Sequence, residues 1–427
     1  MSAAIRSLPG VSLVVAARDR VRALLRVLDR PLGSYYLVLG CTLLLSALGL
    51  LMVLSASSVA AYERTGSSLT YFQRQLIWVG LGLPVLWVAS RLPAKLFRSV
   101  AYPVLGLAVV LLALVLVPGL GHEVNGAQRW IDFGGPFRIQ PSELAKLGLM
   151  LWGADLLARK QKLGTLREWR HLLIPLIPGA GLIVLLVMFG DDLGTTLVLL
   201  TILLALLWVA GAPLRLFALM ASAVVGLVVV LIMLEPYRIQ RLTSFTDPFA
   251  HKLTGGYQAV QGIYAIASGG LWGVGLGASR EKWGYLPHGY TDFIFAIIGE
   301  ELGLVGSLVV LALFALLAYA GFRIARRMTD PFMQLAAAAI TAWLLVQAIV
   351  NIGAVIGLLP ITGIPLPLVS YGGSALLPTM LALGMLLCFA KQEPGARRAL
   401  AARRSGSAGR VVGWFGFGSA ARRRGGG

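Results

Sequence analysis

Asp292 is the residue in this sequence best placed for acid–base chemistry. It follows the polar segment 282–291 and opens an apolar run at residues 292–321. A carboxylate at the rim of a membrane span has low-dielectric neighbours, and these raise its pKa toward the value of a useful general base. The alternative is a structural role, because Thr291 and Asp292 are both residue types that cap helix N-termini. The residues alone leave both roles open.

Glu300 and Glu301 continue the same apolar run. On a helix, Glu300 lies about 80° around the axis from Asp292, and Glu301 lies on the opposite face. Two adjacent carboxylates inside a span are costly and usually face protein or a wet cavity. A substrate-binding role for Glu300 therefore competes with a structural role, in which backbone groups or a basic neighbour satisfy both carboxylates.

A second polar group lies where the segment 119–141 enters the apolar run 142–158. Pro141 suits the first turn of a helix, and the helix dipole favours Glu143 there. Glu143 and Lys146 are three residues apart, so they share a helix face and can form an ion pair. A capped helix start with a snorkelling lysine is one interpretation. The other is a site in which Arg129 and Lys146 neutralise a pyrophosphate.

Three further charged residues are candidates for the site. Asp192 begins the run 192–211, where helix capping is the favoured interpretation. Arg241 and Lys282, in the long segment 236–291, either hold phosphate or are simply solvated. The glycines between Gly273 and Gly277 follow no strand of a βαβ unit, so we reject a nucleotide-binding turn and expect close backbone packing instead.

The composition shows which elements must position these residues. Of 427 residues, 58% are hydrophobic and only 13% are charged, whereas an ordinary soluble domain is about a quarter charged. This excludes a soluble cytosolic enzyme and predicts an all-α, polytopic integral membrane protein. Cys41 and Cys388 both lie in apolar runs, which argues against a disulfide framework or a metal–thiolate site. Ten runs have the length of a membrane span: 35–58, 74–91, 99–118, 142–158, 172–190, 192–211, 215–235, 292–321, 332–358 and 374–390.

The distribution of positive charge predicts the orientation. Ten spans place both termini on one side, and most of the 37 Lys and Arg residues fall on that side. By the positive-inside rule, both termini are cytoplasmic. The net charge of +19 therefore reflects membrane anchoring, and we expect no nucleic-acid partner. The segments 119–141 and 236–291 then lie outside the cytoplasm, so the chemistry is expected at the outer face.

The chain divides into three parts. Residues 1–34 form a basic cytoplasmic arm, 35–390 form the ten-helix membrane domain, and 391–427 form a disordered basic cytoplasmic tail that contacts anionic lipid. The membrane domain contains the large outer loop 236–291, which precedes the eighth span. It also contains the segment 359–373, whose three prolines predict a broken or re-entrant piece rather than a lipid-facing helix.

Five strings together resemble a known family more specifically than any one motif does. They are GAQRWIDFGGPFRIQPSELAK, DLGTT, GGYQAVQGIYAIASGGLWGVGLGASREKWGYLP, TDFIFAIIGEELGLVG and LLPITGIPLPLVSYGGS. In this order, over residues 35–390, they are similar to the SEDS family (shape, elongation, division and sporulation) of membrane peptidoglycan polymerases. The ending KWGYLP is most similar to the actinobacterial members that act in cell division.

The resemblance implies a ten-helix peptidoglycan glycosyltransferase of the cytoplasmic membrane. Such an enzyme polymerises lipid II at the outer face, with inversion and release of polyprenyl pyrophosphate. Asp292 falls on the family's essential aspartate, Glu143 and Lys146 fall on its QPSExxK motif, and Asp192 falls on its DxGT motif. Ser370, in the last string, is a further substrate-binding candidate. The chain departs from the family's usual Glu-Ala-His at residues 288–290, where it has His288, Gly289 and Tyr290.

The resemblance also implies partners and leaves alternatives. The expected partners are a class B penicillin-binding protein (a transpeptidase), other divisome proteins and membrane lipids. A divalent cation, Mg²⁺ or Mn²⁺, is a possible cofactor that the sequence does not establish. The rival functions are a lipid II flippase and a non-catalytic scaffold for the transpeptidase. A role in elongation or sporulation is the alternative to one in division.

Overall fold

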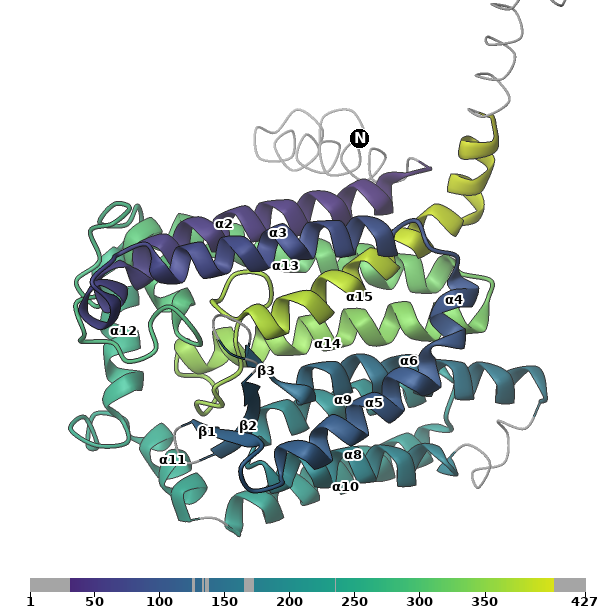
Figure 1. Ribbon diagram of the computed structural model, residues 1–427, viewed down its shortest axis with the longest axis horizontal. Coiled ribbons are helices and arrows are strands. Elements are labelled where there is room, and N and C mark those ends of the chain that lie inside the picture. The colour runs from purple at the N-terminus through teal and green to yellow at the C-terminus, as the bar shows by residue number, and fades with distance from the viewer. Residues whose placement is uncertain are drawn as a thin grey trace, which may run out of the picture.

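The computed structural model describes residues 31–124, 127–132, 134, 138–164, 173–234 and 236–402. Its long helices run side by side in one bundle (Figure 1). In chain order they are α2 (Gly33–Thr65), α3 (Thr70–Ala89), α5 (Ala101–Val115), α6 (Pro141–Lys162), α8 (Leu176–Phe189), α9 (Leu193–Val209), α10 (Leu214–Met233), α13 (Ile294–Arg327), α14 (Pro331–Val355) and α15 (Gly373–Gln392). Each of the ten predicted apolar runs overlaps one of these helices.

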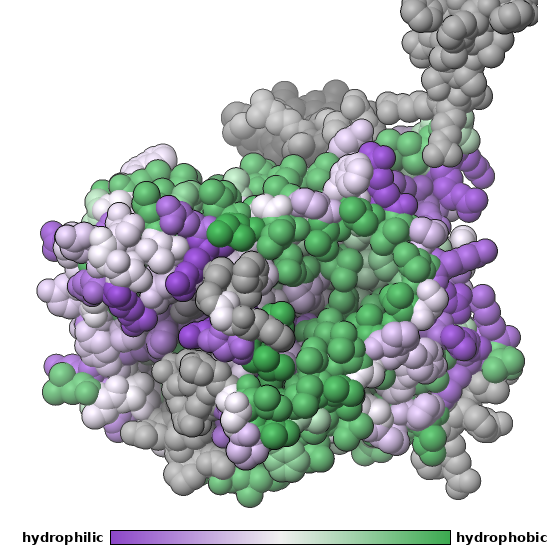
Figure 2. Space-filling view, viewed as in Figure 1, coloured by the Kyte–Doolittle hydropathy of each residue, from purple (hydrophilic) through white to green (hydrophobic). Residues whose placement is uncertain are grey.

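The bundle has the composition of a multi-pass membrane protein. Five of its helices, α2, α10, α13, α14 and α15, are long and apolar enough to cross a membrane, and α5, α8 and α9 are shorter apolar helices. Figure 2 shows a hydrophobic band across the middle of the visible face, with hydrophilic residues gathered at both ends. Hydrophobic side chains can face outward over such a band only where the surrounding solvent is apolar.

Burial separates the inner helices from the outer ones. The apolar windows of α14 and α15 are 72% and 78% buried, whereas no residue of α10 is buried. The core is built around α14, α15 and the polar helix α6, on which 17 of 22 residues are buried. Side chains on α6 and α14 are therefore shielded from solvent and lipid alike, and two of the charged candidates, Glu143 and Lys146, lie on α6.

The two ends of the bundle differ. The beginning of α2 and the end of α15 lie at one end, together with the short helix α4 (Ala94–Ser99) (Figure 1). At the opposite end lie α11 (Pro236–Thr246), α12 (Tyr257–Gly269) and a small sheet. The beginning of α2 and the end of α15 thus lie on the same side of the bundle. The segment 236–291 is not an open loop, because α11 and α12 occupy a large part of it.

The sheet is a feature that the all-α prediction missed. Its three antiparallel strands, β1 (Gly121–Val124), β2 (Ala127–Asp132) and β3 (Arg138–Ile139), are in sequential order. The polar segment between the third and fourth apolar runs folds back on itself, and Gln128 donates a hydrogen bond to the Gly121 carbonyl at 3.3 Å. Strands of two to six residues carry little periodicity, which explains why the sequence did not reveal them.

The predicted parts outside the bundle need one correction. Residues 394–402 are helical, although the sequence predicted disorder from residue 391. Glu393 anchors this stretch, because it pairs with Arg327 at 3.3 Å and its carbonyl accepts the Arg397 N–H at 2.9 Å. Most of the predicted arm 1–34 and the tail beyond residue 402 lie outside the described residues. The segment 359–372 is non-helical, as its prolines predicted.

Candidate active site

Asp292 lies immediately before α13, at the end of the bundle that carries α12. The carboxylate is half-buried, and the Thr291 hydroxyl donates a hydrogen bond to its Oδ1 at 2.9 Å. The N-cap of α13 is Phe293, and no side chain caps the helix. Asp292 is therefore not the N-cap residue of α13, and a catalytic role for its carboxylate stays a prediction.

Asn351 holds the main chain of Asp292 from the neighbouring helix. Its side-chain Nδ2 donates to the Asp292 carbonyl at 2.7 Å and to the Ile364 carbonyl at 2.8 Å. Asn351 is only 2% exposed. One buried amide on α14 thus fixes both the start of α13 and the irregular segment 359–372.

Glu143 and Lys146 form the ion pair that their spacing predicted. The Nζ–Oε1 distance is 2.8 Å, and the residues are only 3% and 1% exposed. Lys146 does not snorkel to a membrane surface; its ammonium also donates to Gln347 Oε1 at 3.3 Å and lies 5.2 Å from the centre of the Trp343 ring. Glu143 Oε2 is buried and has no hydrogen-bond partner. Such a buried pair is costly to form and is weak evidence for stability, and its role toward a substrate stays a prediction.

Trp343, Gln347 and Asn351 form a polar face on α14 that the sequence analysis missed. They are four residues apart, so they lie in one row along the helix. Trp343 Nε1 donates to Gln347 Oε1 at 2.8 Å, and Gln347 Nε2 donates to the Pro365 carbonyl at 3.1 Å. The available signal was the recurrence of polar side chains every fourth residue in an otherwise apolar span. This row connects the Glu143–Lys146 pair to Asp292.

The irregular segment 359–372 is held in place by side chains rather than by a helix ladder. Besides Gln347 and Asn351, Ser370 contributes through its Oγ, which accepts the Leu366 N–H at 2.8 Å. Gln75 on α3 donates to the Ser370 carbonyl at 3.3 Å. Buried backbone carbonyls need such donors, because neither water nor lipid supplies them inside the bundle. In the structure Ser370 therefore has a local structural partner, and substrate binding by it stays a prediction.

Asp192 caps α9, as its position predicted. Its Oδ1 accepts the Thr195 N–H at 2.9 Å, and its Oδ2 accepts the Thr195 hydroxyl at 2.8 Å and Gln140 Nε2 at 2.9 Å. Asp192 therefore also ties the start of α9 to the start of α6. Its carboxylate is thus engaged in holding two helix starts together.

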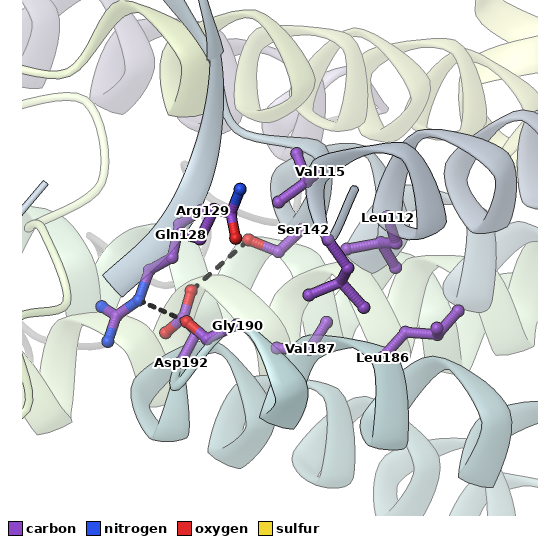
Figure 3. A pocket seen from close by; sticks show the side chains of 10 residues that line it. Leu112, Val115, Gln128, Arg129, Ser142, Leu186, Val187, Gly190 and Asp192 are labelled. Atoms are coloured by element: carbon purple, nitrogen blue, oxygen red, sulfur yellow. Dashed lines mark hydrogen bonds between the residues drawn. The ribbon is translucent and has the colours of Figure 1, made fainter. Parts of the chain in front are cut away.

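Arg129 lies beside Asp192 and not beside Lys146, with which the sequence analysis grouped it. Its guanidinium donates to the carbonyls of Gly190, at 2.9 Å, and of Asp191. It closes the tight connection between α8 and α9 and does not join Lys146. Figure 3 shows the small pocket at this junction, with a volume of about 20 Å³, lined by Leu112, Val115, Leu116, Gln128, Arg129, Ser142, Leu186, Val187, Gly190 and Asp192. This volume suits about one water molecule.

Glu300 and Glu301 bind the glycine-rich segment after α12. Glu300 accepts the Ser279 hydroxyl and, at 2.8 Å, the Arg280 N–H. Glu301 accepts the Ser55 hydroxyl at 2.6 Å and lies 3.9 Å from Lys282 Nζ. Lys282 also donates to the Gly277 carbonyl. Glu300 and Lys282 thus have structural partners. The side chain of Arg241, on α11, lies outside the described part of the chain.

The glycines of this segment pack against the backbone of α13, as predicted. The helix is broken at Gly303, whose φ of 67° favours glycine. At the break, the N–H groups of residues 274 and 275 donate to the carbonyls of residues 300 and 301, and those of residues 304 and 305 donate to the carbonyls of residues 270 and 271. A Cβ on Gly303 would lie 2.3 Å from the Gly273 nitrogen.

Glu281, in the same outer segment, has a raised carboxyl pKa. Burial, with a smaller contribution from the Glu300 carboxylate, raises its pKa from 4.5 to about 7. Its Oε2 is buried without a hydrogen-bond partner. The described residues contain no group of three or more His, Cys, Asp or Glu side chains placed to hold a metal.

Comparisons with known proteins agree with this architecture. A family model for cell cycle proteins, named for FtsW, RodA and SpoVE, matches residues 35–394. The probable peptidoglycan glycosyltransferase FtsW of Mycobacterium tuberculosis is 46% identical over 386 residues, which cover 90% of this chain and 73% of that protein. Stage V sporulation protein E of Bacillus subtilis is 39% identical over 346 residues, covering 81% and 94%.

Two solved structures also resemble the fold of this chain. A chain from a peptidoglycan synthase complex that coordinates polymerization and crosslinking is 31% identical, with a TM-score of 0.68 over 84% of this chain and 97% of that one. The rod shape determining protein RodA of Thermus thermophilus is 29% identical, with a TM-score of 0.61 over 84% and 97%. The chain therefore belongs to the FtsW/RodA/SpoVE family, whose members are also described as SEDS proteins.

Proposed function

We propose that this protein is a peptidoglycan glycosyltransferase of the FtsW type, which polymerises lipid II at the outer face of the cytoplasmic membrane during septal cell-wall synthesis. The observation that carries the proposal is Asp292, whose half-buried side chain accepts a hydrogen bond from Thr291 and whose main chain is held by Asn351. The FtsW-named relatives, which are up to 46% identical, support the choice of division over elongation or sporulation.

The proposed chemistry needs one base. Asp292 accepts the proton of the acceptor sugar's 4-hydroxyl as that oxygen attacks the anomeric carbon of the donor. The bond from the anomeric carbon to the polyprenyl pyrophosphate breaks, and the configuration inverts. The leaving group departs as a stabilised anion and requires no general acid. The hydrogen bond from Thr291 orients the carboxylate, and Asn351 fixes its distance from the segment 359–372.

The proposed topology has ten spans and cytoplasmic termini. It is supported by the common end at which α2 begins and α15 finishes, and by the excess of Lys and Arg at that side. Asp292, α11 and α12 then lie at the outer face. A class B penicillin-binding protein is the proposed partner, because a structural neighbour comes from a complex that coordinates polymerization with crosslinking.

The test is polymerisation of purified lipid II by the full-length protein in liposomes. Wild type is compared with Asp292→Ala and Asp292→Asn, each with and without the cognate transpeptidase and Mg²⁺ or Mn²⁺. We expect glycan chains from wild type only. Equal product from the variants would remove Asp292 from its role. If no protein forms product, lipid II translocation in the same liposomes tests the flippase, and its absence would leave the scaffold.

A further inference from the structure

Exposed apolar side chains follow one another on the glycine-rich segment after α12. Trp272 is 80% exposed and Leu271 is 62% exposed, and Val274 and Leu276 are exposed as well. Residues 268–279 include no charged side chain. A contiguous exposed apolar surface of this kind marks a contact with a protein partner or with a membrane.

The main chain of this segment is bound to α13. The Leu304 N–H donates to the Gly270 carbonyl at 3.0 Å, and the Val305 N–H donates to the Leu271 carbonyl at 3.2 Å. Gly273 lies so close to the helix that a Cβ on it would be 2.2 Å from a carbonyl oxygen of α13. Irregular main chain is tolerated at membrane depth only where protein groups satisfy its polar atoms, and these bonds meet that condition.

The position of these bonds along α13 gives the height of the segment in the membrane. From residue 304 to residue 322 the helix has no charged side chain, and Arg323 follows. A run of this length matches the about 20 apolar residues that cross the hydrocarbon core. Leu304 and Val305 are exposed at the outer end of the run. Their bonds to residues 270 and 271 therefore place the segment at the boundary between acyl chains and headgroups.

The composition of the segment suits this boundary. Tryptophan and tyrosine are enriched where the hydrocarbon meets the headgroups, and Trp272 is followed by Trp283 and Tyr285, which are both exposed. The exposed residue Arg280 comes only after the apolar side chains. The apolar surface is also continuous with the exposed side of α13, because the Val305 N–H is bonded to this segment. This continuity favours lipid over a protein partner.

We infer that residues 271–276 form an interfacial anchor, which inserts its apolar side chains among the lipids of the outer leaflet. Glu300 ties the end of the segment to α13, because its carboxylate accepts the Ser279 hydroxyl and the Arg280 N–H. Part of the outer loop 236–291 is then in the membrane. The inference goes beyond the proposed glycosyltransferase function and takes only the outer orientation from it.

The experiment measures contact with lipid. Leu271→Cys and Val274→Cys are each labelled with a fluorophore in the full-length protein, in which Cys41→Ala and Cys388→Ala remove the native thiols. The protein is placed in phosphatidylcholine nanodiscs that contain a phospholipid with a nitroxide near the top of its acyl chain. We expect the nitroxide to quench both labels as strongly as a label on Leu308→Cys, since Leu308 is exposed on the apolar run of α13.

Two controls use the turn between α11 and α12. A label on Lys252→Cys, an exposed residue of that turn, should be quenched by aqueous iodide and not by the lipid. The double variant Leu271→Ser with Trp272→Ser should lose lipid quenching of the Val274 label, because the side chains that favour insertion are gone. Leu253→Ser is the matched variant, since Leu253 is as apolar and is 87% exposed in the turn, and should leave that quenching unchanged.

Each outcome bears on the anchor. Lipid quenching at residues 271 and 274 that is no stronger than at residue 252 would overturn it. Iodide quenching that stops only when the cognate transpeptidase is added would also overturn it and assign the surface to that protein. Undiminished quenching in the double variant would show that α13 alone holds the segment in place. Should Leu271→Cys fail to fold, the Val274 label decides the question. These readouts need no polymerisation of lipid II, so failure of the proposed function would leave the anchor standing.

Discussion

The side-chain amide of Asn351 donates to two main-chain carbonyls, those of Asp292 at 2.7 Å and Ile364 at 2.8 Å. Both partners are acceptors, so only one amide orientation satisfies them, with Nδ2 toward the carbonyls and Oδ1 away from them. Asn351 Oδ1 is indeed buried without a partner. The position of the proposed base therefore depends on a side chain of α14, 59 residues further along the chain.

Replacing Asn351 by Leu should slow polymerisation without removing the base. Leucine has a similar size but no donor, so both carbonyls lose their partner and Asp292 can shift. A displacement of the base by about 1 Å lowers kcat by about 10²-fold. The measurement is the initial rate of glycan formation from lipid II, with Ile349→Ala as the control, because Ile349 is 52% exposed on the same helix. A rate equal to that of wild type in folded Asn351→Leu would show that Asn351 does not position the base.

The buried ion pair gives a prediction about stability. Lys146→Met leaves the Glu143 carboxylate buried without its cation, and breaking a buried pair in this way costs about 3–5 kcal/mol. The double variant Glu143→Gln with Lys146→Met has no unpaired charge and should recover most of the lost stability. Chemical unfolding in detergent of wild type, both single variants and the double variant measures the coupling between the two side chains.

Polymerisation by the same double variant separates stability from function. If Glu143 and Lys146 act electrostatically on the substrate, the stable double variant should still be inactive. Full activity in the double variant would mean that the pair serves folding alone. Free energies of unfolding that simply add across the two sites would contradict the buried-pair account.

Local sequence patterns predicted those parts of the structure that depend on near neighbours. The apolar runs became helices, Glu143 found Lys146 three residues away, and Asp192 capped the helix that follows it. The row Gln347–Asn351 could be placed on a helix face, but its partners lie on another segment and at Asp292. Helical spacing fixes which side chains share a face and says nothing about which distant carbonyls that face meets.

The same limit explains why Arg129 does not lie beside Lys146. Arg129 was expected beside Lys146 because both belong to one motif, yet it binds the carbonyls between α8 and α9, 61 and 62 residues away. Charge and spacing in the sequence identified Arg129 as a candidate for binding an anion. Tertiary packing decides which groups its guanidinium contacts, and these are the two carbonyls between α8 and α9.

Gly303→Ala should destabilise the junction between α13 and the glycine-rich segment. Alanine is strained at a φ of 67°, and its Cβ would lie 2.3 Å from the Gly273 nitrogen. A strained residue of this kind costs about 1–3 kcal/mol, to which lost hydrogen bonds add. Gly226→Ala on α10, where a Cβ meets nothing within 4 Å, is the control and should be neutral or slightly stabilising. Thermal unfolding of the two variants beside wild type tests this, and equal Tm values would contradict it.

Glu281 makes the stability of the outer segment depend on pH. Burial and the Glu300 carboxylate raise its pKa from 4.5 to about 7, so the folded protein favours the protonated form. A group whose folded-state pKa is raised contributes its full stability below its unfolded pKa and loses it as the pH rises through the folded pKa. The contribution of Glu281 should therefore be complete below about pH 4.5 and be lost as the pH passes 7.

Glu281→Gln provides the comparison, because its neutral amide resembles the protonated carboxyl at every pH. The Tm of wild type should approach that of the variant at about pH 5 and fall below it by about pH 8, and the gap should open near pH 7. Asp247→Asn serves as the control, since Asp247 lies in the same outer segment but away from Glu281 and Glu300. The Tm difference between wild type and Asp247→Asn should not open in this way near pH 7. A Tm difference between wild type and Glu281→Gln that stays constant from pH 5 to pH 8 would mean that the Glu281 carboxyl does not change its protonation in this range.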